Sequence, residues 1–394
     1  MAHAAIDDLT ADLVQLRRDI HMHPELGFQE QRTAALIAAR LRAAGVEVHE
    51  GIGGTGLVGV LRNGNSARAI GLRADMDALP FQEETGLAHA SRHDGVFHGC
   101  GHDGHVAMLL GAALHLARTR QFDGTVHFIF QPAEEGLAGG RAMVEDGLFQ
   151  RFPCDRVYAL HNWPELPLGT IATCPGPIMA AADRFEIAFV GRGGHAAMPQ
   201  DTPDAIAAAA ALVAQLNMIV SRCVSPTDSA VLSVTQIHGG HAHNVLPARV
   251  MVGGTVRSFD PDVQDVIETR VRDMTAGTAQ SFGLDVDIRY DRYYPATIND
   301  ADAAAEALHA AASTGADVRA AHAAFTSEDF AFMLQACQGA YIWLGQGDAT
   351  GGTPLHNPRY DFNDDALPVG IRLHVALVER WLEGGAGAGR PPES

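Results

Sequence analysis

The chain has 394 residues, of which 47% are hydrophobic and 19% charged, and its formal net charge is -19. This composition is that of a globular protein with enough apolar residues for two or three domains. The excess of acidic residues, without a local basic patch, argues against binding to nucleic acid or to an anionic membrane surface.

Three features of the sequence bear on its compartment. The N-terminal segment lacks the basic and apolar regions of a secretory signal, and no segment is apolar over the length of a bilayer span. Five cysteines occur without CxxC pairs, which favours a reducing compartment. We therefore expect a cytoplasmic protein.

The first predicted element is a helix over 10–44 that is interrupted at His23-Pro24. Apolar runs then predict five strands, with a helix of small residues at 105–120 between the third and the fourth. The strands are expected at 46–49, 57–61, 69–74, 126–130 and 157–160. Short apolar strands that alternate with helices indicate an α/β domain with a mostly parallel, largely buried sheet.

The pattern changes near Ala181 to a β-α-β-β-α-β order, which is typical of a ferredoxin-like domain. Its strands are expected at 184–190, 230–237, 250–258 and 284–290, and its helices at 204–220 and 261–281. The earlier pattern resumes after Thr297, with elements at 301–314, 330–337, 340–344 and 368–382. We therefore expect a discontinuous domain over 1–181 and 296–383, an inserted domain over 182–295, and a disordered Gly- and Pro-rich tail at 384–394.

Polar side chains follow three of the strands expected in the first domain. Because ligands bind at the carboxyl ends of strands in an open α/β sheet, these residues are expected at one edge. They are Asp75, Asp77, Glu134, Glu135 and His161. A Gly-rich turn adds Cys100 and His102, and His356 is a further candidate for the same edge. A thiolate, imidazoles and carboxylates together predict a metal site with a general base, which indicates a metal-dependent hydrolase.

Each residue of this set has a simpler interpretation when taken alone. A single Cys is usually a small core residue, and a single His after a strand is usually structural. Two adjacent glutamates at a buried strand end are costly unless a cation compensates them, and this favours the metal. The glycine pattern at 51–56 spells G-x-G-x-x-G, but a strand-like segment follows it, so we interpret it as a β-turn rather than a dinucleotide site.

Several sequence blocks resemble those of the aminoacylase/carboxypeptidase-type dinuclear metallopeptidases, peptidase family M20. The match is closest to the amidohydrolase branch of hippurate hydrolases, N-acyl-amino-acid deacylases and auxin-conjugate hydrolases. The blocks are Arg18–Glu25, Gly71–Pro80, His98–Asp103, Gln131–Gly136 and Gly194-His195, within a match from about residue 12 to 382. The resemblance implies an α/β catalytic domain with an inserted ferredoxin-like dimerisation or lid domain, and a homodimer or a higher homo-oligomer.

The resemblance also implies what individual residues do. Cys100 would bridge two divalent ions, and the shells of these ions would be completed by His102, Glu135, His161 and His356. Glu134 would be the general acid/base. The substrate carboxylate would be held by Asn244 and Arg257, and the oxyanion would be stabilised from a neighbouring subunit by His195. We do not expect Asp75 to bind metal directly, whereas Asp77 would support a ligand.

We therefore expect an enzyme that cleaves the amide bond of N-acyl amino acids, such as hippurate-like or N-acetyl compounds. The ions would be zinc or manganese, with nickel or cobalt as alternatives. Within the same class, the chain could be an N-acetyl-diaminopimelate deacetylase or a small-peptide exopeptidase. The alternative of a different class is a non-catalytic binding protein of the same fold, which would have little reason to keep Glu134 beside a complete ligand set.

Overall fold

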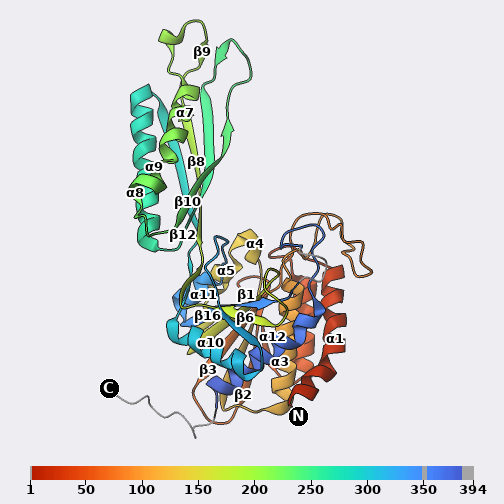
Figure 1. Ribbon diagram of the computed structural model, residues 1–394. Coiled ribbons are helices and arrows are strands. Elements are labelled where there is room, and N and C mark those ends of the chain that lie inside the picture. Colours follow the sequence, from red (N-terminus) through yellow and green to blue (C-terminus); the bar gives the residue numbers. More distant parts are fainter. Residues whose placement is uncertain (1, 348–352, 384–394) are drawn as a thin grey trace, which may run out of the picture. The chain divides into compact units, whose positions relative to one another are not determined.

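The computed structural model describes residues 2–347 and 353–383, so the tail expected at 384–394 lies outside the described residues. The chain divides into two compact units (Figure 1). Of the described residues, the first unit comprises 2–178, 298–322, 329–347 and 353–383, and the second comprises Met179–Thr297 and Ala323–Glu328. The segment 323–328, which the sequence analysis placed in the first domain, thus belongs to the second unit. The reason is backbone pairing, because the amide of Ala180 donates to the carbonyls of Ala324 at 3.1 Å and Thr326 at 2.9 Å.

The first unit is built on an eight-stranded sheet in the order β1-β2-β4-β3-β5-β16-β6-β15. The four central strands, β4, β3, β5 and β16, are parallel, and all residues of β3 and β16 are buried. The bounds are β1 Glu47–Ile52, β2 Gly56–Asn63, β3 Ala69–Asp75, β4 Gly124–Gln131, β5 Arg156–Trp163, β6 Thr170–Thr173, β15 Asp317–Ala320 and β16 Gly339–Gly345. The predicted α/β fold with a mostly parallel sheet is confirmed. β1 and β2 form an antiparallel hairpin, so no helix follows the glycine pattern at 51–56.

The helix α3 (His102–Thr119) lies at the centre of the core of this unit, where α1 (Ala2–Met22) and α12 (Leu367–Trp381) pack against it. Its small residues allow this close packing. A Cβ on Gly111 would lie only 2.7 Å from the Leu13 Cδ1 atom and 2.8 Å from the Ile371 Cδ1 atom. The other helices are α2 Gln31–Ala43, α4 Glu134–Leu137, α5 Gly139–Glu145, α6 Leu148–Arg151, α10 Ala301–Ser313, α11 Ala331–Ala336 and the 3-10 helix η2 Asp364–Ala366.

The second unit has a four-stranded antiparallel sheet in the order β10-β12-β8-β13, with three helices packed on one face. Its elements follow the predicted β-α-β-β-α-β order. They are β8 Ala181–Val190, α7 Ala205–Leu216, α8 Ile219–Cys223, β10 Ala230–His238, β12 Arg249–Ser258, α9 Pro261–Phe282 and β13 Asp285–Tyr294. The helix expected over 204–220 is divided between α7 and α8. At the break, the Asn217 side chain donates to the Val213 carbonyl at 2.9 Å, a local bond that competes with helix continuation.

Two short sheets complete the structure. β9 (Gly194–His195) pairs with β11 (Val245–Leu246), and β7 (Gly176–Met179) pairs with β14 (Thr297–Asn299); the 3-10 helix η1 spans Pro199–Asp201. Among the described residues, no helix combines the length and the hydrophobicity needed to cross a membrane.

Candidate metal centre

Potential ligands of the first unit gather where β3, β4 and β5 end. Two overlapping groups have ligand atoms within 4.8 Å of one another: Cys100, His102 and Glu135 form one, and Asp75, His102, His105 and His161 form the other. The Cys100 Sγ atom lies 3.5 Å from the His161 Nε2 atom. The half-exposed His356 places its Nε2 atom 3.0 Å from the Glu135 Oε1 atom. The structure thus brings together all five residues that the resemblance names as ligands.

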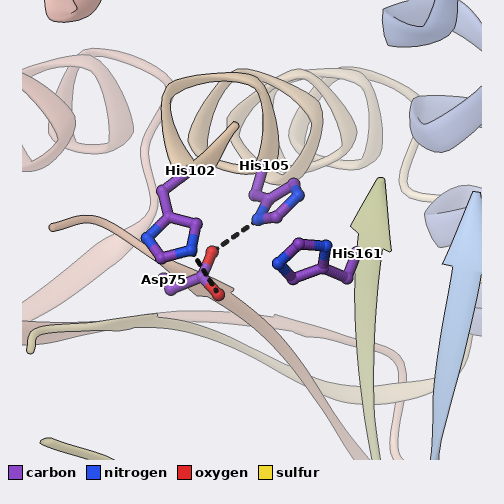
Figure 2. A group of neighbouring side chains, drawn as sticks. All are labelled: Asp75, His102, His105 and His161. Carbon is purple, nitrogen blue, oxygen red and sulfur yellow. Dashed lines mark hydrogen bonds and ion pairs between the residues drawn. The ribbon is translucent and has the colours of Figure 1, made fainter. Parts of the chain in front are cut away.

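Two of the histidines turn one ring nitrogen toward this cluster. His102 donates from Nδ1 to the carbonyl oxygen of Asp77 at 2.9 Å, and the carboxylate of Asp77 lies 3.2 Å away. Its Nε2 atom is buried and forms no hydrogen bond among the described residues, but it lies 3.6 Å from the Asp75 Oδ2 atom (Figure 2). His161 donates from Nδ1 to the carbonyl of Asn162 at 2.8 Å, which leaves its Nε2 atom facing Cys100. A backbone or carboxylate partner on one nitrogen is what orients a metal-binding imidazole.

Asp75 and His105 are held by the protein itself (Figure 2). His105 donates from Nδ1 to Asp75 at 2.5 Å, and its Nε2 atom lies 2.6 Å from the Asn162 side-chain oxygen. The other carboxylate oxygen of Asp75 accepts from Arg73 at 2.7 Å. Both ring nitrogens of His105 therefore have protein partners, so this residue orients Asp75. No function was predicted for His105, although its spacing of three from His102 on a helix was an available signal.

The backbone around the ligands adopts left-handed conformations. Gly101, between two potential ligands, has φ 92°, and a Cβ there would lie 2.4 Å from the Asn162 Oδ1 atom and 2.6 Å from the Tyr360 hydroxyl. Ala133 has φ 54° and Gly136 has φ 81°, on either side of the adjacent glutamates. These turns direct the side chains from the strand ends into one cluster.

The pKa shifts in the cluster describe a site that favours cations. Burial, followed by the charges of Glu135 and Glu134, raises the pKa of the Cys100 thiol well above its usual value. Burial opposes protonation of His102, but the carboxylates of Asp75, Asp77 and Glu135 together outweigh it and raise the pKa of His102 to about 10. A divalent cation would reverse both effects, because it stabilises the thiolate and takes the place of the imidazole proton. The donor set of one thiol, imidazoles and carboxylates therefore fits two divalent ions.

The remaining predicted residues lie in the second unit, and the structure does not bring all of them together. His195 in β9 pairs with Val245, directly after Asn244, and the amide of Ala196 donates to the Asn244 carbonyl at 3.0 Å. This hairpin follows the end of β8 that pairs with Arg249. Arg257 lies near the other end of β12, where burial lowers its pKa. The eight residues of strand from Arg249 to Arg257 correspond to about 26 Å. Asn244 and Arg257 of one chain therefore cannot hold the same carboxylate.

Residues 71–380 match the profile of Peptidase family M20/M25/M40. The chain is 39% identical to a hippurate hydrolase of Campylobacter jejuni, with 95% of this chain and 98% of the relative covered. It is 37% identical to an N-acetylcysteine deacetylase of Bacillus subtilis, with 94% and 97% covered. A crystal structure of a dinuclear metal-binding peptidase from Bacillus subtilis superposes with a TM-score of 0.84, at 34% identity and with 96% and 99% covered.

Proposed function

Since the chain belongs to Peptidase family M20/M25/M40, we propose that it is a metal-dependent amidohydrolase that cleaves N-acyl amino acids into a carboxylic acid and a free amino acid. The observation that carries the proposal is the cluster of Cys100, His102 and Glu135 with Glu134 buried at its side. The names of its relatives, a hippurate hydrolase and an N-acetylcysteine deacetylase, support the substrate class.

The proposed chemistry divides between the ions and Glu134. Two divalent ions, zinc or manganese by the donor set, would supply Lewis-acid activation of a water molecule and of the scissile carbonyl. The cluster would hold them through Cys100, His102, Glu135, His161 and His356. Glu134 accepts the proton of the attacking water and returns it to the leaving nitrogen. Its exposure of only 7% keeps the carboxylate in a site with little competing water.

We further propose that the active unit is a homodimer. Arg257 offers a planar pair of donors for the carboxylate of the substrate. His195 and Asn244 lie on one hairpin beyond the Arg249 end of β12, and about 26 Å of strand separates Arg249 from Arg257, so they would serve the site of the partner subunit. His195 would thus stabilise the oxyanion from the partner subunit, as expected from the resemblance. Asn244 would also come from the partner subunit and not from the subunit that supplies Arg257. The substrates are proposed to be small molecules. The protein is proposed to act in the cytoplasm, and its five free cysteines support this compartment.

The substrate class is tested on apo-protein that is supplied with one divalent metal at a time. The panel contains hippurate, N-acetylcysteine, N-acetyl-diaminopimelate and a dipeptide, and the release of free amino acid is measured. Glu134→Gln should keep both ions and lose about 10²–10⁴-fold in kcat, whereas Glu135→Gln should also lose metal. Turnover at the wild-type rate by metal-loaded Glu134→Gln would contradict the assignment.

The shared site is tested by mixing two inactive variants, His195→Ala and Glu134→Ala. A mixed dimer contains one site with both lesions and one with neither. Random mixing makes half of the dimers mixed, so activity should return to about a quarter of the wild-type value. If proven heterodimers stay as inactive as the parents, His195 does not act across the dimer.

A further inference from the structure

Glu30 is a buried carboxylate that the chemistry proposed above does not use. It directly precedes α2 and has no solvent exposure, but its side chain does not cap that helix. Its Oε1 atom instead accepts the backbone amide of Ala133 at 2.8 Å, and its Oε2 atom accepts the hydroxyl of Thr55. Among the described residues, no cationic side chain forms an ion pair with it. A buried carboxylate without a counter-ion is costly, so a structural or functional gain must offset it.

The amide that Glu30 accepts belongs to the turn that carries Glu134 and Glu135. Ala133 has φ 54° and ψ 44°, a left-handed conformation that costs an alanine about 1–2 kcal/mol. Its carbonyl accepts the amide of Gly139 at 2.9 Å, so the turn is held on both sides. Without the bond to Glu30, relaxation of Ala133 toward ordinary angles would move both glutamates.

The glycine pattern at 51–56 is part of the same support. A Cβ on Gly56 would lie 2.9 Å from the Pro132 Cδ atom, and a Cβ on Gly53 would lie 2.6 Å from the Met143 backbone nitrogen. Gly56 thus lets the β1–β2 hairpin pack directly against the turn after β4, and Gly53 lets it pack against α5. Thr55, which lies between Gly53 and Gly56 in the sequence, donates its hydroxyl to the Glu30 carboxylate. Close packing at Gly53 and Gly56 and a positive φ of 77° at Gly51 therefore explain the G-x-G-x-x-G sequence without phosphate binding.

We propose that Glu30 is a positioning residue that ties the glycine hairpin to the Ala133 turn and so aims Glu134 and Glu135 at the metal centre. This inference rests on the proposed function, in which Glu134 is the general acid/base and Glu135 is a metal ligand. A partner that orients a ligand affects metal affinity or activity by about 10–100-fold, and a displacement of about 1 Å can cost about 100-fold in rate.

The test compares Glu30→Met, which keeps the side-chain volume but removes both acceptors, with Glu30→Gln, whose amide oxygen still accepts from Ala133. Glu30→Met should lower kcat by about 10–100-fold with KM nearly unchanged, and should weaken binding of the second metal about tenfold in a chelator competition. Glu30→Gln should restore both values to within a few-fold of wild type.

The matched control is Glu25→Met at the same end of α2. The Glu25 carboxylate accepts the amides of Arg32 at 2.9 Å and Thr33 at 2.8 Å, so its loss weakens the helix start without touching Ala133. Glu25→Met should leave kcat and metal affinity near wild type. If Glu30→Met does not fold, Thr55→Val, which removes only the hydroxyl that holds Glu30, should show the same pattern at smaller amplitude.

Any of three results would overturn the proposal. The first is wild-type kcat and metal affinity in folded Glu30→Met, or in Thr55→Val if Glu30→Met does not fold. The second is a Glu30→Gln variant as impaired as Glu30→Met, and the third is an equal loss of kcat and metal affinity in Glu25→Met. The metal competition needs no substrate. A wild-type protein that hydrolyses no N-acyl amino acid would therefore refute the proposed function while the competition still decides whether Glu30 supports the centre.

Discussion

Replacement of Gly101 by alanine is expected to disrupt both the fold and the metal centre. The φ of 92° costs an L-residue about 1–2 kcal/mol. The new Cβ would lie 2.4 Å from the Asn162 Oδ1 atom and 2.6 Å from the Tyr360 hydroxyl, and such overpacking adds about 1–3 kcal/mol. The free energy of unfolding should therefore fall by about 2–5 kcal/mol. Because Cys100 and His102 flank this residue, metal affinity should fall as well.

The matched control is Gly95→Ala. Gly95 also has a positive φ, 73°, but a Cβ there meets nothing within 4 Å, so only the conformational cost of about 1–2 kcal/mol applies. Urea unfolding of the two variants and of wild type separates strain from overpacking, and metal content per chain reports on the centre. Equal unfolding free energies for the two variants, with full metal content in Gly101→Ala, would refute the reasoning.

Three further expectations concern the same centre and its surroundings. Alkylation of Cys100 should be slow in metal-loaded protein and fast after chelation, whereas Cys223 of the second unit should react at the same rate in both states. The rates are measured by peptide mass spectrometry, and an unchanged rate at Cys100 would argue against a metal-binding thiolate. N-acyl amino acids should be cleaved far faster than their methyl esters, and Arg257→Lys should raise KM for the free acid; equal kcat/KM for acid and ester would exclude the carboxylate clamp. Burial opposes protonation of His21, but Asp103 and Glu83 together outweigh it and raise the pKa of His21 from 6.5 to about 9. The resulting stability, about 3 kcal/mol, is present below pH 6.5 and is lost as the pH rises through 9. Urea unfolding of metal-loaded protein, in which His102 would bind metal rather than a proton, should therefore show a decline between pH 6.5 and 10 that is smaller by about this amount in His21→Gln.

Sequence patterns alone indicated the fold class and the donor types of the site. The apolar runs of β3 and β16 predict buried parallel strands, because strands covered on both faces need no polar alternation. His161 and the adjacent glutamates follow apolar runs directly, so their placement at the strand ends required only local information. The bounds of helices were less predictable. α3 begins three residues earlier than expected, because Gly101 provides a left-handed start that periodicity does not reveal.

Only the tertiary structure decided how distant residues support one another. Glu30 and Ala133 are 103 positions apart, and nothing in either local pattern indicates that a carboxylate of one segment accepts the amide of the other. The pairing of His105 with Asp75, and the placement of Asn244 and Arg257 in different sheets beyond opposite ends of β12, likewise depend on strand register and direction. Local sequence determines residue types and periodicity, whereas contacts across a hundred residues depend on how whole elements pack, and this is set by the summed burial of the core.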